Sequence, residues 1–178
     1  AIVVGGTFCA VKLAGKRVDK MLVKSPVAMK AAFGENPKRV YGSARQTPAT
    51  RMATAALLRG LLFKSRLYEE DWAAYEKDRE GKKRPDFDLQ LKSMRPVIRG
   101  EIPLKVHAHR ADDIFTALRI AREFGLKITL DHCTDGALIA DELAGEDVPV
   151  LVGPSFGSKT KIELAHKSFA TPKILMEA

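Results

Sequence analysis

Apolar and polar positions alternate regularly in the second half of the chain. Short apolar runs at residues 103–109, 127–132 and 148–153 have the length and composition of strands. Residues 112–124 lie between the first two runs and carry apolar positions at helical spacing, with Gly125 suited to end that helix. Strands and helices joined by connections of a few residues predict parallel strands with right-handed crossovers.

The first third of the chain is rich in predicted strands. Residues 1–13 hold two short apolar runs, and residues 19–23 predict a weak strand or a turn. Residues 27–33 form a continuous apolar run interrupted only by Lys30, which predicts a strand buried on both faces. Residues 34–48 contain many turn formers and predict a loop.

Helical patterns occupy the middle of the chain. Residues 50–80 begin with Thr50, which can cap a helix, and then show helical periodicity. Because this helix is unusually long and grows more charged toward its end, we expect it to project beyond the core. Residues 86–100 predict a second helix. Farther along, Thr134 can cap a helix that ends at Gly145.

Composition excludes several classes of protein. Hydrophobic residues make up 46% of the 178 positions, which is typical of a folded domain. No apolar run reaches the ~20 residues of a membrane span and no leader is visible, so we expect a cytoplasmic protein without a membrane partner. The chain opens inside a predicted strand and without Met, which suggests that the natural protein begins upstream. Cys9 and Cys133 are too few for a disulfide framework and are interpreted as reduced thiols.

Charge leaves one further class of partner open. The net charge is +8, from 30 basic and 22 acidic residues. Such a charge permits binding to nucleic acid or to another acidic partner. The chain lacks interleaved aromatic residues of the kind that stack bases, so we interpret the charge as a solvated surface and expect no nucleic-acid partner.

Histidines gather at the predicted ends of two neighbouring strands. Strand alternation puts Lys105, His107 and His109 on one face. His132, beside Asp131, ends the next strand, one strand–helix unit later. The carboxyl ends of parallel strands are where barrel active sites lie, so these imidazoles can share a divalent ion. A single histidine is more often a satisfied, partly buried side chain, but three at adjacent strand ends favour a metal site.

Lys30 is the other unusual residue, because it interrupts an apolar run. Such a lysine must either extend to solvent or lose its charge, since burial favours the free amine. A free amine can take up carbon dioxide and become a carbamate, which is an anionic, bidentate metal ligand. The residues alone leave both outcomes open.

Three motifs carry a resemblance to a known family. They are GENPKRVYG at residues 34–42, VHAHRADDI at 106–114 and DHCTDG at 131–136. Together they resemble the amidohydrolase superfamily, and most closely its imidazolonepropionase-like, metal-dependent hydrolases. The resemblance implies a (β/α)8 TIM-type barrel with one or two divalent ions, most reasonably zinc, at its carboxyl face.

The resemblance also implies roles for individual residues. Lys30 falls where many members carry a carboxylated, metal-bridging lysine, and His107 and His132 fall on the metal-binding histidines of the fifth and sixth strands. His109 then supports the ligands or faces the substrate as a catalytic group; the alternative is that His109 is the ligand and His107 its support. Residues of the loop after strand four can contact a small-molecule substrate: Glu35, Asn36, Arg39 and Tyr41.

The chain departs from the family pattern in two places. It has no His-x-His pair before Lys30, and it ends before the eighth strand, whose aspartate binds metal and accepts a proton in the family. We therefore expect one incomplete α/β barrel domain over residues 1–178, with roughly strands three to seven and a helical insertion at about residues 49–100. Because a partial barrel has open sheet edges, we expect it to form a homo-oligomer.

Three hypotheses for function follow. The first is a fragment of a metal-dependent amidohydrolase that cleaves the C–N bond of an amide or cyclic amide with metal-activated water, and that is inactive alone. The second is a non-catalytic basic α/β module that binds nucleic acid or another acidic partner. The third is a family member that keeps the fold and has lost the chemistry.

Overall fold

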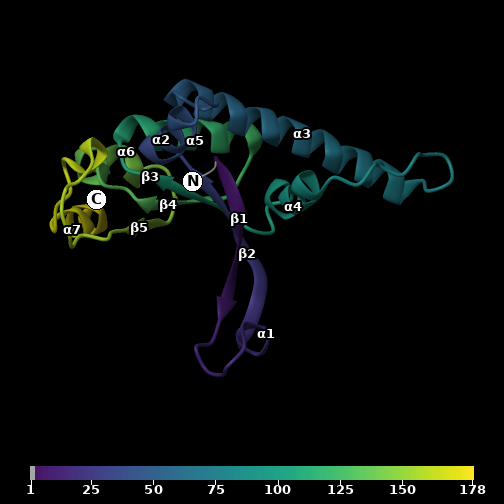
Figure 1. Cartoon of the computed structure of the whole chain (residues 1–178), viewed down its shortest axis with the longest axis horizontal. Helices are drawn as coiled ribbons and strands as arrows, with labels where there is room; N and C mark the ends of the chain where they lie inside the picture. The colour runs from purple at the N-terminus through teal and green to yellow at the C-terminus, as the bar shows by residue number, and fades with distance from the viewer. Residues whose placement is uncertain (1–2) are drawn as a thin grey trace.

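A computed structural model describes residues 3–178, which form one five-stranded sheet in the order β1-β2-β3-β4-β5 (Figure 1). Strand β1 runs antiparallel to β2, and the other neighbours are parallel. The fold is therefore a mixed α/β fold with a mostly parallel sheet. The strands are β1 Val4–Val11, β2 Leu22–Ala32, β3 Leu104–Ala108, β4 Ile128–His132 and β5 Val150–Val152.

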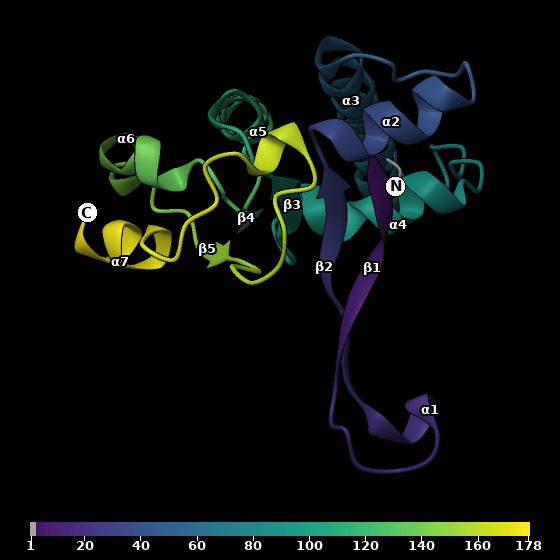
Figure 2. The ribbon, with the colours of Figure 1, turned by 60° about the vertical axis from the view of Figure 1, so that its left-hand side comes forward.

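Helices connect the strands and cover the sheet. Helix α5 lies over β3 and β4 in both ribbon views (Figures 1 and 2). The helices are α1 Val18–Met21, α2 Glu35–Ser43, α3 Arg51–Lys77, α4 Leu89–Ile98, α5 Ala111–Phe124, α6 Ala140–Ala144 and α7 Thr171–Glu177, with 3-10 turns η1 Gly136–Leu138 and η2 Ile162–Leu164.

The register of the parallel strands separates a core face from a polar face. Ala31, Val106 and Leu130 are in register across β2, β3 and β4, and each is at most 1% exposed. This row packs with Ile114 and Leu118 of α5 in the hydrophobic core. Since side chains alternate along a strand, the neighbouring positions point to the opposite face, where the polar residues gather.

The first strand differs from the expected barrel. Strand β1 is antiparallel to β2 because the short connection between them, which holds only α1, cannot contain the crossover that parallel strands require. The pair forms a long ribbon that extends away from the sheet (Figure 1). Of residues 19–23, where a weak strand or turn is predicted, the first three lie in α1 and the last two begin β2. The parallel part of the sheet is thus β2 to β5, which is one strand fewer than strands three to seven of a barrel would give.

The segment predicted as a loop contains a helix. Helix α2 occupies Glu35–Ser43, although this stretch is rich in turn formers. Pro37 lies in its first turn, where a missing N–H group removes no helical hydrogen bond. Gly34 precedes the helix with a φ of 77°, a conformation that favours glycine.

The long helix predicted after Thr50 is confirmed. The Thr50 side chain accepts a hydrogen bond from the Ala53 N–H and caps α3. Leu58 and Leu62 are buried in the core, whereas the later turns project beyond the sheet (Figure 1). Helix α4 packs against α3 and begins at Leu89, slightly later than predicted. No helix within residues 3–178 is both long and apolar enough to cross a membrane.

The helix predicted after Thr134 is shorter than expected. A 3-10 turn, η1, and the five-residue α6 replace it, and the Thr134 side chain does not cap either one. The hydroxyl of Thr134 instead contacts His109, so this residue belongs to the site described next.

Candidate metal centre

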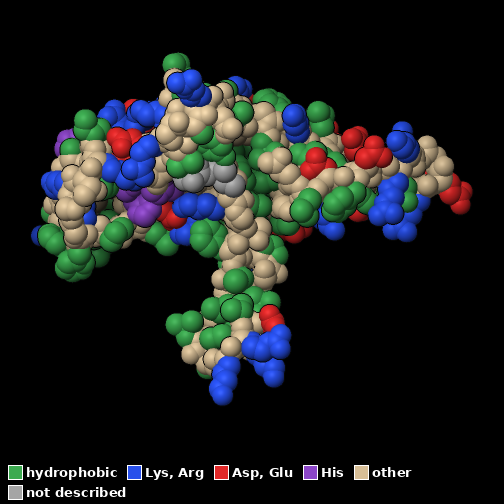
Figure 3. All heavy atoms as spheres, in the orientation of Figure 1, with side chains coloured by type: hydrophobic (Ala, Val, Ile, Leu, Met, Phe, Trp, Pro, Cys, Tyr) green, Lys and Arg blue, Asp and Glu red, His purple; other side chains and the backbone are tan. Residues whose placement is uncertain are grey.

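Three imidazoles meet at the carboxyl ends of β3 and β4. His107 lies on β3, His109 is the first residue after this strand, and His132 ends β4. Ring centroids are 4.5 Å apart for His107 and His132, and 4.8 Å apart for the two pairs that include His109. One ligand atom from each ring lies within 4.8 Å of the others, so the three could hold one metal ion. Figure 3 shows histidine side chains reaching the surface on this face, beside lysine and arginine side chains.

An unusual backbone conformation brings His132 to the cluster. In register, His132 pairs with Ala108 and Asp131 pairs with His107, so regular alternation would put Asp131, not His132, on the His107 side. His132 has a φ of 74° and the next residue, Cys133, has a φ of 47°. Left-handed conformations at two residues other than glycine are costly and concentrate at functional sites. The turn in the backbone redirects the His132 ring toward His107.

Hydrogen bonds fix the proton positions on two of the rings. His132 donates its Nδ1 proton to the Gly153 carbonyl at 2.5 Å, which leaves Nε2 with a free lone pair. His107 Nε2 accepts a hydrogen bond from the Asn36 amide nitrogen at 2.9 Å. Lys161 Nζ donates to Asn36 Oδ1 at 2.6 Å, which explains why the amide nitrogen, rather than the oxygen, faces His107.

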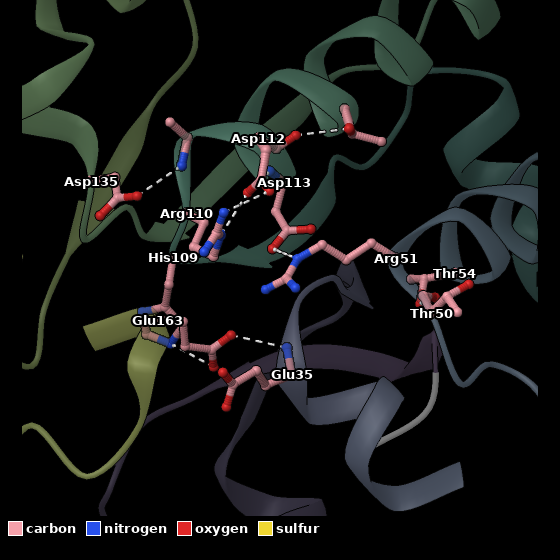
Figure 4. Close-up of polar contacts among 12 residues, drawn as sticks. Glu35, Thr50, Arg51, Thr54, His109, Arg110, Asp112, Asp113, Asp135 and Glu163 are labelled. Carbon is pink, nitrogen blue, oxygen red and sulfur yellow. Dashed lines mark hydrogen bonds and ion pairs between the residues drawn. The ribbon is translucent and has the colours of Figure 1, made fainter. Parts of the chain in front are cut away.

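His109 has a different environment. Its Nδ1 lies 2.7 Å from the hydroxyl of Thr134. Its Nε2 lies 3.9 Å from Oε1 of Glu163, and Figure 4 shows these two side chains facing each other. Both ring nitrogens therefore face protein groups, and the three-histidine cluster alone does not decide between His107 and His109 as the ligand.

The electrostatics of the site keep the imidazoles of His107 and His109 neutral at neutral pH. Burial lowers the pKa of His107 to about 3, with further lowering by His132 and His109. Burial also lowers the pKa of His109 to about 4, again helped by the neighbouring His132. Neutral imidazole is the form that binds a metal ion.

Lys30 lies on the same polar face but is paired with a carboxylate. Its Nζ is 3.3 Å from Oδ2 of Asp131, and Lys105 pairs with the other oxygen of that carboxylate. The Lys30 side chain is 30% exposed, which agrees with a lysine that extends toward solvent. The cluster found among the described residues consists of the three histidines, and ligation by Lys30 stays a prediction.

The four residues predicted to contact substrate lie on α2 and diverge. Asn36 contacts His107, and the Glu35 backbone N–H donates to Glu163. Arg39 is exposed, and Tyr41 lines another cavity together with Pro48 and Leu57. Because a helix turns each side chain by 100° from the last, the four side chains leave α2 in different directions, and their contact with substrate stays a prediction.

Several site residues were not predicted from the sequence. Glu163 of η2 has a side chain with 0% exposure, and Lys161 precedes it in the same segment. No periodic signal marks them, since both lie in a short polar connection. A cavity of about 210 Å³ adjoins His109 and His132, and its other lining residues are Thr134, Val152, Gly153, Pro154, Ser155, Leu164, Lys167, Ser168 and Thr171.

Cys133 and His166 lie outside the cluster. Burial raises the pKa of the Cys133 thiol to about 11, so the thiol stays protonated and packs in the core. This agrees with its interpretation as a reduced thiol. His166 is 59% exposed and contacts Asp135, as expected for a surface residue.

Comparisons with known proteins agree with the resemblance seen in the motifs. No family model matches the chain. A crystal structure of an amidohydrolase from Thermotoga maritima MSB8 superimposes with a TM-score of 0.93 and 42% sequence identity over 98% of this chain and 45% of that chain. Amidohydrolase tasK from Hapsidospora irregularis is 29% identical over 125 residues, which are 65% of this chain and 12% of tasK. The chain spans less than half of either relative, and the likeness supports a fragment of an amidohydrolase-family protein.

Proposed function

We propose that this chain forms part of a metal-dependent amidohydrolase that hydrolyses the C–N bond of an amide or cyclic amide. The observation that carries the proposal is the meeting of three imidazoles at the ends of two adjacent parallel strands. In this proposal β2 to β5 are consecutive strands of a (β/α)8 barrel, whose active sites lie at that end. The cavity beside His109 and His132 supports a small-molecule substrate.

The donor set fits a divalent ion, most reasonably zinc. His132 offers Nε2, because its Nδ1 proton is held by Gly153, and His107 offers the Nε2 lone pair that Asn36 now contacts. We propose Lys30, as a carbamate, for a further ligand. Lys105 also pairs with Asp131, so this carboxylate keeps a cation when the Lys30 amine is modified. A bound ion supplies a Lewis acid that polarises a carbonyl and lowers the pKa of a water molecule.

The protein's own groups complete the chemistry. Thr134 can donate its hydroxyl proton to His109 Nδ1, which places the imidazole proton on Nε2. From there His109 donates a hydrogen bond to the oxygen that becomes negative when a carbonyl is attacked. Asn36 lies beside His107 and is proposed to contact substrate. We propose the same role for Glu35, Arg39 and Tyr41 of α2.

Metal analysis of the natural full-length protein tests the proposal. We expect stoichiometric zinc, lost in His107→Ala and His132→Ala and kept in the control His166→Ala, whose side chain is exposed and outside the cluster. Hydrolysis of a panel of amides and cyclic amides should follow the same pattern. A wild-type protein without metal, or DNA binding with a steep salt dependence, would instead support the basic-module hypothesis.

A further inference from the structure

A short segment after β5 crosses the site and contacts both sides of it. Residues 161–163 contain Lys161 and the start of η2, and they reach the first turn of α2 through Asn36 and Glu35. In Figure 2 the chain between β5 and α7 passes beside β3 before it returns to α7. We call residues 161–163 the strap.

Glu163 of the strap is a buried carboxylate with an unusual environment. Its Oε2 accepts the backbone N–H of Glu35 at 2.9 Å (Figure 4). Its Oε1 is buried without a hydrogen-bond partner among the described residues. A buried, unpaired carboxylate oxygen is costly, so its position calls for a physical reason.

Two donors flank that oxygen. His109 Nε2 lies 3.9 Å from Oε1, and Lys161 Nζ lies 3.6 Å from it. A carboxylate opposite Nε2 favours the tautomer that carries its proton there, because a lone pair at Nε2 would face a negative oxygen. Thr134 at Nδ1 accommodates this tautomer by donating its hydroxyl proton.

Lys161 acts on the other histidine. Its amine holds Asn36 Oδ1 at 2.6 Å, which turns the amide nitrogen toward His107 Nε2. His107 then accepts at Nε2 and keeps its proton on Nδ1. Glu163 is thus connected to the tautomer of His109, and Lys161 is connected, through Asn36, to the tautomer of His107.

We propose that Lys161 and Glu163 are positioning residues that select the tautomers of His107 and His109. Glu163 keeps the proton on Nε2 of His109, and Lys161, through Asn36, keeps Nε2 of His107 as an acceptor. The consequence for catalysis rests on the proposed function, since it makes His107 the ligand and His109 the donor. The tautomers themselves are properties of the metal-free protein and can be measured without a bound ion.

The first test replaces Glu163 with glutamine in the natural full-length protein. The amide of Glu163→Gln can still accept from Glu35 through its oxygen, which turns its NH2 group toward His109. We expect His109 to change from the Nε2–H to the Nδ1–H tautomer, measured by nitrogen-15 NMR of the imidazoles in metal-free protein. Glu142→Gln, at an exposed position on α6, is the control and should leave His109 unchanged. An unchanged His109 tautomer in Glu163→Gln would overturn the proposal.

The second test does not disturb a buried group. Lys161 has a side chain that is 25% exposed, and Lys161→Met frees the Asn36 amide to turn over. We expect a mixture of His107 tautomers in the metal-free protein. Lys159→Met is the matched control, because the Lys159 amine binds only the Ala165 carbonyl among the described residues. A single, unchanged His107 tautomer in Lys161→Met would overturn the role of Lys161.

The two tests separate this inference from the proposed function. Wild-type protein without zinc would refute the metal-dependent hydrolase, whereas the NMR measurements need no metal. If Glu163→Gln does not fold, the His107 spectrum of Lys161→Met decides the proposal.

Discussion

The lowered pKa values of the site histidines predict that the metal-free protein loses stability in mild acid. Burial and the neighbouring imidazoles lower the pKa of His107 from 6.5 to about 3, and that of His109 from 6.5 to about 4. The unfolded chain therefore binds these protons at a higher pH than the folded protein does. The contribution of these two histidines to the free energy of unfolding is fully present above pH 6.5. It is lost as the pH falls from 6.5 toward each folded pKa.

The magnitude follows from these shifts. At pH 5 an unfolded histidine is almost fully protonated, whereas both folded rings are mostly neutral. Linkage gives about 2 kcal/mol lost for each ring, and about 4 kcal/mol in total, between pH 8 and pH 5. Carboxylates with lowered pKa values, such as Glu69, begin to contribute only below about 4.5, so they leave this window to the histidines.

Urea unfolding at pH 8, 6.5 and 5 in the presence of a chelator measures this effect. His107→Gln removes one of the two titrating rings, so its loss of stability over the same range should shrink to about 2 kcal/mol. His166→Gln replaces an exposed ring and should keep the full dependence. A free energy of unfolding that is constant within 1 kcal/mol, or that rises as the pH falls, would refute the reasoning.

Three further predictions concern the core, the thiols and association. Leu62→Ala, at a position with 0% exposure, should lower the free energy of unfolding by about 2–5 kcal/mol. Leu67→Ala, on the exposed side of α3, should change it by less than about 0.5 kcal/mol. Equal effects of the two variants in urea titrations would contradict the packing of α3. In the folded protein an aromatic disulfide reagent should modify exposed Cys9 quickly and buried Cys133 only on unfolding. The reason is that burial and the raised pKa of Cys133 leave it almost no thiolate. Rapid release of two equivalents of the aromatic thiolate from the folded protein would oppose this. Light scattering of this chain should show an oligomer, because the described sheet ends in the edge strands β1 and β5, which can pair with another chain; a monodisperse monomer would count against it.

The sequence alone determined the elements with strong periodic signals. It predicted β3, α5 and β4 within one or two residues, because apolar spacing and the glycine at 125 are local features. It also predicted that His107 and His132 would meet, since one strand–helix unit separates them and parallel strands end at one edge. The Thr50 cap and the long α3 were equally local.

Tertiary structure decided the rest of the site. The direction of β1 depends on how little chain separates it from β2, and the α2 helix forms where turn-forming residues happen to suit a first helical turn. His132 reaches the cluster through a left-handed backbone that strand alternation does not predict. Glu163 is buried because distant segments enclose it, and its contacts with Glu35 and His109 join positions far apart in the sequence. Periodicity reports which face of one element is apolar, whereas the partner of a polar atom depends on which segments the complete fold brings together.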